Sequence, residues 1–184
     1  MERVSRVKEF VFKRGTDLWP VGETLWHVYA LPNLSQDTSL AKLVSSCRDA
    51  VRDEPITIVD PSWLHVTVAQ VSDAVGRSTS ADEIKELRSA LQVQLQGIAP
   101  FDILVGSCLS YPSGLVFDLS PDDELNRLRD AVAEVIGRVR GPAALAFDPG
   151  VLHLTIACVR MVNDHGQRPG VRSTEPEPAD AVVL

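Results

Sequence analysis

Two short segments of the chain carry the same pairing of an imidazole with a hydroxyl. Residues 63–71 read WLHVTVAQV and residues 151–159 read VLHLTIACV, with Leu, His, Thr, Ala and Val at five of the nine aligned positions. Each copy contains a His-x-Thr motif, and the two copies use two of the four histidines in the chain. The four side chains are His65, Thr67, His153 and Thr155. A match of this length in two places indicates a duplicated unit.

Both segments have the alternation of half-buried β-strands. Residues two apart in a strand point to the same face, so each histidine shares a face with its threonine, while the aliphatic residues between them share the other. We expect helices to cover the aliphatic face, which turns the imidazoles and hydroxyls away from those helices. An imidazole buried without a partner costs about 1–3 kcal/mol, so stability alone does not require this pattern.

Two imidazoles beside two hydroxyls suit acid–base chemistry at a phosphodiester. Imidazole titrates near neutrality, so one ring can accept a proton while the other, already protonated, donates one. Each hydroxyl can donate to a non-bridging phosphate oxygen, where negative charge accumulates. We therefore predict His65 and His153 as the catalytic pair and Thr67 and Thr155 as phosphate-binding residues, with no metal or other cofactor required. Which histidine is the base stays open.

The elements around the two motifs repeat as well. The pattern predicts a buried strand over 25–31, an amphipathic helix over 36–52 and a strand over 63–71. It then predicts a strand over 115–119, a helix that starts after a Ser120 cap with Pro121 in its first position, and a strand over 151–159. The predicted fold is α+β, with two pseudo-symmetric strand–helix–strand lobes, about 25–99 and 100–162, around a central cleft.

The remaining segments connect or flank these units. Ser80 and Glu83 have the spacing of a capping box, which predicts a helix start, and residues 101–105 alternate as a strand. Residues 1–14 are locally basic, and residues 1–24 are expected to form an N-terminal arm. The composition of residues 163–184 predicts a mobile tail, and residues 181–184 can return from it as a short edge strand.

Two further residues are candidates for substrate binding. His27 lies in the first predicted strand, where it can contact substrate, complete a three-histidine metal site with His65 and His153, or be a half-buried sheet histidine. Tyr111, in the loop before residue 115, can stack on a nucleobase at the rim of the cleft or be an ordinary turn residue. Trp26 and Trp63 are expected to fill the core.

At these motifs the sequence resembles the 2H phosphoesterase superfamily, and within it bacterial proteins described as 2′-5′ RNA ligases or cyclic phosphodiesterases. The resemblance covers about residues 25–159 and implies a bilobal fold with a central cleft. It implies the opening of 2′,3′-cyclic phosphates or related cyclic phosphodiesters of nucleotides or RNA ends, and in some members reversible 2′-5′ joining of RNA ends. It also implies that His65 and His153 are catalytic and that Thr67 and Thr155 bind phosphate.

The sequence departs from the family pattern at one position that bears on function. Cys158 stands five residues after the second histidine, where members often have an arginine. Arg160 is nearby, but strand alternation places it on the face opposite His153. A non-catalytic RNA- or nucleotide-binding module with the same cleft is therefore the alternative to an enzyme.

Composition limits the remaining classes. The 184 residues carry a formal net charge of −7, which argues against duplex DNA as a partner. No apolar run reaches the roughly 18–20 residues of a membrane-spanning helix, and the first residues lack a signal peptide's apolar stretch. Three cysteines without CxxC spacing suit a reducing compartment. We expect a cytoplasmic, monomeric protein that acts on a nucleotide or an RNA end.

Overall fold

The computed structural model of the chain describes residues 13–14, 17–18, 23–54, 56–148, 150–159 and 181–183. Most of the predicted N-terminal arm and C-terminal tail lie outside these ranges. In the part of the arm that is described, β1 (Lys13–Arg14) pairs with β2 (Asp17–Leu18). The predicted edge strand at the C-terminus is confirmed as β9 (Ala181–Val183), which pairs in parallel with β3 (Trp26–Ala30).

One seven-stranded sheet contains both predicted motif strands at its centre. The strand order is β6-β7-β8-β5-β3-β9, and β4 pairs with β8 off this path. Apart from the parallel β3–β9 pair, all pairings in this sheet are antiparallel. The bounds of the other strands are β4 (Ile56–Ile58), β5 (Val66–Val71), β6 (Leu104–Tyr111), β7 (Gly114–Ser120) and β8 (His153–Val159).

The sheet order reproduces the predicted duplication. β3 and β5 bound the first strand–helix–strand unit, and β7 and β8 bound the second. In the order β7-β8-β5-β3, the two motif strands are neighbours and their companions lie outside them, as a pseudo-twofold between β8 and β5 requires. The fold is thus mixed α/β with a mainly antiparallel sheet, as expected.

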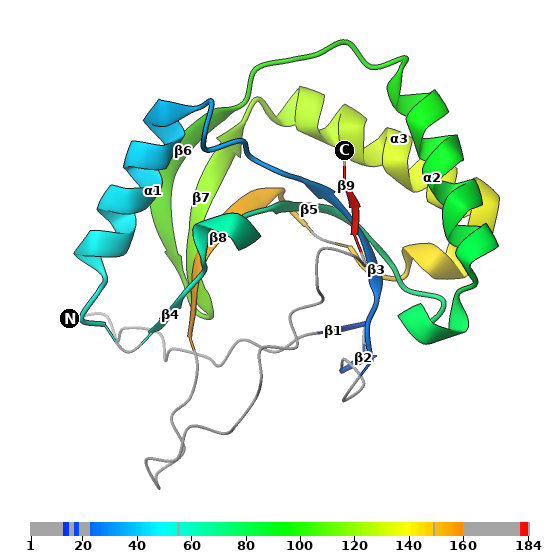
Figure 1. Cartoon of the computed structure of the whole chain (residues 1–184), viewed down its shortest axis with the longest axis horizontal. Helices are drawn as coiled ribbons and strands as arrows, with labels where there is room; N and C mark the ends of the chain where they lie inside the picture. The colour runs from blue at the N-terminus through cyan, green and yellow to red at the C-terminus, as the bar shows by residue number, and fades with distance from the viewer. Residues whose placement is uncertain are drawn as a thin grey trace, which may run out of the picture.

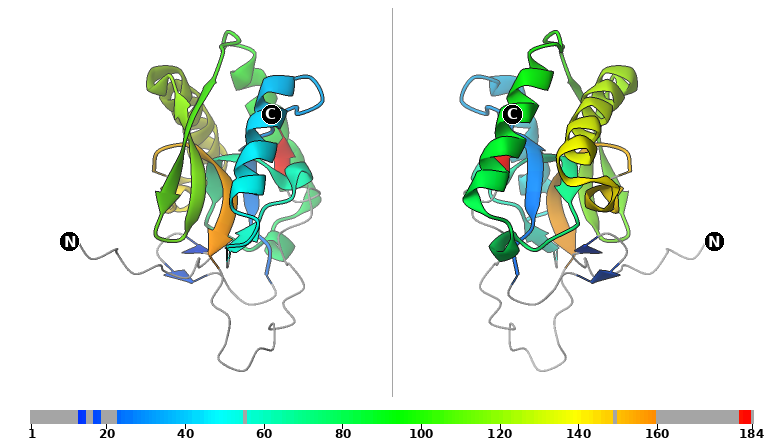
Figure 2. Two further views of the ribbon diagram at one scale, coloured as in Figure 1. Left: turned by 90° about the vertical axis from the view of Figure 1, so that its left-hand side faces the viewer. Right: turned by 90° about the vertical axis from the view of Figure 1, so that its right-hand side faces the viewer.

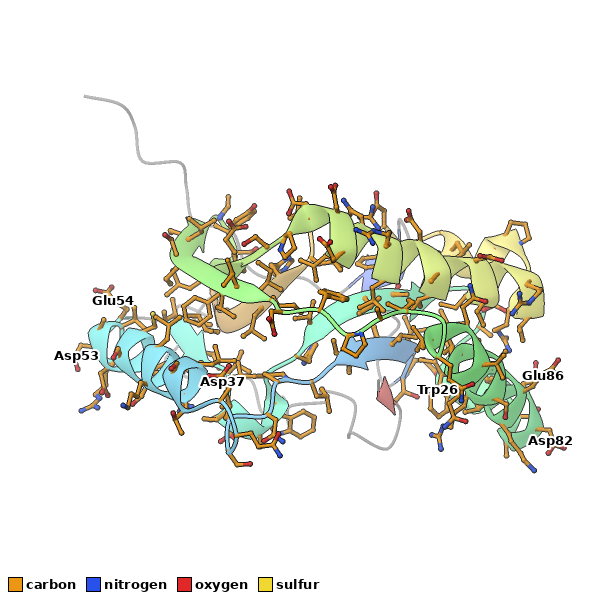
Figure 3. The ribbon with its side chains drawn as sticks, turned by 90° about the horizontal axis from the view of Figure 1, so that it is seen from above. Trp26, Asp37, Asp53, Glu54, Asp82 and Glu86 are labelled. Atoms are coloured by element: carbon orange, nitrogen blue, oxygen red, sulfur yellow. The ribbon has the colours of Figure 1, made fainter. Side chains whose placement is uncertain are left out.

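Three α-helices are formed by the described residues, α1 (Thr38–Ala50), α2 (Ala81–Leu95) and α3 (Asp122–Arg140). Figure 1 shows α1 on one side, beside β6 and β7, and α2 and α3 on the other, over β3 and β5. Asp37 caps α1 by accepting a hydrogen bond from the Leu40 amide at 2.8 Å (Figure 3). None of these helices is long and apolar enough to cross a membrane.

Two hydrophobic cores lie on the same face of the sheet. The α1 core packs Leu40 and Val44 against Val66 of β5 and Leu154 of β8, whereas the core under α2 and α3 includes Val68 of β5. Val66 and Val68 are two residues apart on one strand, so both cores share a face. The prediction that helices cover the aliphatic face is confirmed (Figure 2).

The helices are exchanged between the two halves of the sequence. α1, from the first unit, packs on β7 and β8 of the second, and the core of α3 includes Val28 of β3. Both cores therefore combine residues from either side of residue 100. The domain limits at 25 and 162 and the lobe boundary near 100 stay predictions.

Several helices and strands begin at other residues than the sequence predicts, for local reasons. The first motif strand begins at Val66 rather than at residue 63, because residues 61–63 form a short 3₁₀ helix whose cap, Asp60, accepts from the Ser62 amide at 2.9 Å. The strand expected at 101–105 is β6, which starts at residue 104. α3 begins at Asp122 with Pro121 as its N-cap, so the expected Ser120 cap is wrong.

The predicted capping box of α2 is confirmed. The Ser80 amide donates to Glu83 Oε2 at 2.7 Å, and the Glu83 amide donates to Ser80 Oγ at 3.2 Å. Hydrogen bonds from Ser80 lower the pKa of the Glu83 carboxyl, and the bond from the Ser80 backbone has a larger effect than the bond from its side chain. Arg140 at the end of α3 bonds both Glu83 and Asp73, which ties the two helices to the end of β5.

Candidate functional site

The two motif strands meet at a single register pair, Val66 opposite Leu154. Continuing this antiparallel register places His65 opposite Thr155 and Thr67 opposite His153. Directly opposed side chains in such a pair have Cβ atoms about 4.5–5.5 Å apart. The sheet therefore gathers the four predicted side chains into one patch on the face away from the helices, here called the histidine face.

Both motif histidines are oriented by the same backbone contact. His65 Nδ1 lies 2.7 Å from the Trp63 carbonyl oxygen, and His153 Nδ1 lies 2.8 Å from the Val151 carbonyl oxygen. A carbonyl oxygen only accepts, so Nδ1 is the protonated nitrogen and donates in both rings. Nε2 is then the nitrogen that gains or releases a proton, as an acid–base role requires. The two motif histidines therefore have the same tautomer, with the proton on Nδ1.

Burial follows the predicted alternation. Leu64 is 3 % and Leu152 is 4 % exposed, whereas His65 and Thr67 are half-buried and His153 is exposed. Both rings are therefore on the accessible side of their strands. The histidines keep access to solvent and ligand while the aliphatic residues next to them hold the strands in place.

An aromatic residue that was not predicted lies against the first histidine. The ring centroids of Tyr29 and His65 are 4.0 Å apart, with the planes inclined by 32°. On its own strand Tyr29 also stacks with His27, at 5.2 Å and 18°. The sequence contained a signal for this residue, because His27 and Tyr29 are two apart in a strand and share a face.

His27 lies at the buried end of this column of rings. The residue is 7 % exposed. Its Nδ1 donates to the Leu25 carbonyl oxygen at 3.1 Å, and its Nε2 accepts from the side-chain Nε2 of Gln70 at 3.2 Å. Gln70 Oε1 in turn accepts from Ser72 Oγ at 3.1 Å. Burial, opposed by the bond to Leu25 and reinforced by the nearby His65, lowers the pKa of His27 to about 4. The ring is therefore neutral at pH 7.

These contacts bear on the alternatives for His27. Its two ring nitrogens both have partners within the protein, which matches the sheet-histidine interpretation. Within the described ranges, no group of three or more His, Cys, Asp or Glu side chains is arranged to hold a metal ion. Direct contact between His27 and substrate stays a prediction.

The loop before β8 is held by a long-range contact. Arg129 Nη1, on α3, donates to the Gly150 carbonyl oxygen at 3.0 Å, one residue before the carbonyl that orients His153. The Gly150 amide donates to Asp148 Oδ1 at 2.8 Å, and its φ of +67° favours glycine. A pocket of about 230 Å³ lies between the start of α3 and residues 150–152; neither motif histidine lines it. Nothing local in the sequence marks Arg129.

The second motif has a different cross-strand neighbour. In the β7–β8 register Asp118 is opposite His153, and Asp118 is exposed. Gly106 of β6 lies beside Asp118, where an added Cβ would be 3.9 Å from Asp118 Oδ2, in ordinary contact. An acidic group is thus next to the predicted catalytic patch.

Tyr111 is far from the histidines. It pairs with Gly114, which pairs with Cys158, and Cys158 is five residues along β8 from His153. At about 3.3 Å per residue this separation is roughly 16 Å. Tyr111 is 55 % exposed at the end of its hairpin, and its role as a substrate contact stays a prediction. Arg160 lies outside the described residues.

Several solved structures share the fold of this chain. TT0787 of Thermus thermophilus superposes with a TM-score of 0.59 at 16% identity, covering 75% of each chain. The MHV ns2 PDE domain gives 0.53 at 16% identity, covering 74% of this chain and 82% of its own. E. coli LigT in its apo form gives 0.52 at 19% identity, covering 82% and 80%.

The family follows from the sequence as well as from the fold. The 2′-5′ RNA ligase superfamily matches residues 35–164, and the chain belongs to this superfamily. Comparison with curated protein sequences gives no match. Family and fold together support an enzyme activity of the 2H phosphoesterase and 2′-5′ RNA ligase type.

Proposed function

We propose that the protein opens 2′,3′-cyclic phosphates, or related cyclic phosphodiesters, of nucleotides or RNA ends by acid–base catalysis between His65 and His153. The observation that carries the proposal is the matched orientation of the two imidazoles. Each donates Nδ1–H to the carbonyl two residues before it, and extending the register of the Val66–Leu154 pair brings each opposite the other motif's threonine.

The reaction needs one proton accepted and one proton donated. One Nε2 takes a proton from water as the water oxygen forms a bond to phosphorus. The bond between phosphorus and one ribose oxygen breaks, and the other ring, as imidazolium, protonates that oxygen. The resemblance implies that the 3′ oxygen leaves, so the product carries a 2′-phosphate. Thr67 and Thr155 donate to the non-bridging oxygens, where negative charge increases during the attack.

A nucleotide substrate is supported by one solved relative. A structure of E. coli LigT complexed with 3′-AMP superposes with a TM-score of 0.50 at 19% identity. The same displacement, with the 5′-hydroxyl of a second RNA end attacking phosphorus in place of water, would break the bond to the 3′ oxygen and join the ends through a 2′-5′ linkage. The superfamily's name makes this second activity worth measuring on the same protein.

The test is hydrolysis of 2′,3′-cyclic AMP in the presence of EDTA, with 2′-AMP and 3′-AMP separated by chromatography. We expect turnover to 2′-AMP, and a loss of at least about 10²-fold in His65→Ala and in His153→Ala. His165→Ala serves as the matched control, since His165 belongs to neither motif. Full activity in either motif variant contradicts the mechanism.

A non-catalytic nucleotide-binding module is the second candidate. It is favoured by the half-buried Cys158, which occupies the position where related proteins often have an arginine. Tight binding of 2′,3′-cyclic AMP by calorimetry, with no product after prolonged incubation, would select this function. Stoichiometric zinc after purification, with activity lost on chelation, would instead favour a metal-dependent enzyme.

A further inference from the structure

We propose that Tyr29 is a positioning residue for His65, an inference that rests on the proposed function of the same site. The two rings are in contact, with centroids 4.0 Å apart and planes inclined by 32°. The hydrogen bond from Nδ1 to the Trp63 carbonyl holds one edge of the imidazole. The tyrosine ring packs against the ring itself, and we infer that this contact helps to fix the direction of Nε2.

The strand register explains why Tyr29 reaches the histidine. Tyr29 is the cross-strand partner of Thr67, and His65 is two residues before Thr67, next to the first residue of β5. Diagonal neighbours of this kind are within reach of aromatic side chains. The register of β3 and β5 shifts between Val28 and Tyr29, so the irregularity begins where Tyr29 must align with the motif.

Tyr29 is itself held in place by His27 on the same strand. His27 stacks on it at 5.2 Å, and His27 is bonded to the Leu25 carbonyl and to Gln70. His27, Gln70 and Ser72 are the buried polar residues of the described chain, and they form one hydrogen-bonded chain. Because the tyrosine ring contacts both His27 and His65, we assign it to the support of His65 rather than to stacking on a nucleobase.

The second half of the molecule has no equivalent ring at the matching position. The residue opposite Thr155 is Val116, where Tyr29 is opposite Thr67. A change at Tyr29 therefore alters the orientation of one histidine and leaves the other unchanged. Misplacing one acid–base group by about 1 Å can cost about 10²-fold in rate without weakening substrate binding.

Kinetics of three variants test the positioning role. Tyr29→Val removes the ring and reproduces the residue of the other half, Tyr29→Phe keeps the ring, and Trp26→Leu removes an aromatic residue from the opposite face of the same strand (Figure 3). We expect Tyr29→Val to lower kcat at least about tenfold with KM within about twofold of wild type. Tyr29→Phe and Trp26→Leu should retain most of kcat, although Trp26→Leu lowers the free energy of unfolding. Equal kcat values in Tyr29→Val and Trp26→Leu would overturn the proposal.

A second readout needs no turnover. A tyrosine face shields the protons above it, so the imidazole proton resonances of His65 should lie upfield in wild type and move downfield in Tyr29→Val, but not in Trp26→Leu. Assignment uses a His65→Gln variant, since the chain has four histidines. Unchanged His65 resonances overturn the contact even if the enzyme is active, whereas absent turnover with shifted resonances removes only the proposed function. Tyr29→Leu replaces Tyr29→Val if the latter does not fold.

Discussion

His65 and His153 come from matched segments and make the same backbone hydrogen bond, at 2.7 and 2.8 Å, yet the surrounding protein supports them differently. His65 is half-buried and lies on Tyr29, above a buried polar chain. His153 is exposed, and its support is the loop at residues 150–151, held by Arg129 of α3. The two copies of the motif therefore share the histidine tautomer, which the local backbone determines. They differ in the residues that hold each ring in place, because those residues belong to neighbouring elements.

The largest expected effect tests whether the two unlike halves form one catalytic unit. His65→Ala and His153→Ala should each lower kcat by about 10²–10⁴-fold. The double variant should be no slower than the slower single variant by more than a few fold, because residues that act as a unit are not additive. Multiplied losses in the double variant would show two independent contributions. Single-turnover kinetics on 2′,3′-cyclic AMP gives the rates.

The next largest effect is on the pH dependence of the free energy of unfolding. It concerns only the first half of the molecule, because His27 belongs to that half. The pKa of His27 is lowered from 6.5 to about 4, so between these values the unfolded chain binds a proton that the folded chain does not. Stability should therefore fall as the pH decreases from 6.5 to 4, by about 3 kcal/mol at most, and be unaffected by this group above 6.5. Urea unfolding at several pH values measures it.

A neutral replacement supplies the control for this slope. His27→Gln has no proton to gain in this range, so its stability should change less than that of wild type between pH 6.5 and 4. The same slope in both proteins would mean that another group causes the acid destabilisation. Activity is measured alongside, because loss of the ring under Tyr29 also tests the support of His65.

The smallest expected effect concerns the second half. Arg129→Ala releases the Gly150 carbonyl, which loosens the loop that orients His153, and should lower kcat by about tenfold. Arg127→Ala is the matched control, since Arg127 pairs with Glu124 on its own helix at 2.9 Å. Arg129→Lys should lie between wild type and Arg129→Ala. Indistinguishable kcat values for Arg129→Ala and Arg127→Ala would remove the loop from the mechanism.

Local patterns in the chain were enough to predict the motif strands, their two faces and the capped start of α2. These features depend on residues two to four apart, whose side-chain directions follow from strand and helix geometry alone. The tautomer belongs to the same class, because Trp63 and Val151 are two residues from their histidines. His27 and Tyr29 were likewise readable as one strand face.

Packing of whole elements settled which strands became neighbours and which helices cover them. The pairing of Val66 with Leu154 joins residues far apart in the chain, and α1 and α3 exchange halves. The Arg129–Gly150 bond spans 21 residues, and Tyr29 reaches His65 through the register shift in β3 and β5. Such contacts form only when distant elements come together, and a short stretch of sequence carries no information about the partner it will meet.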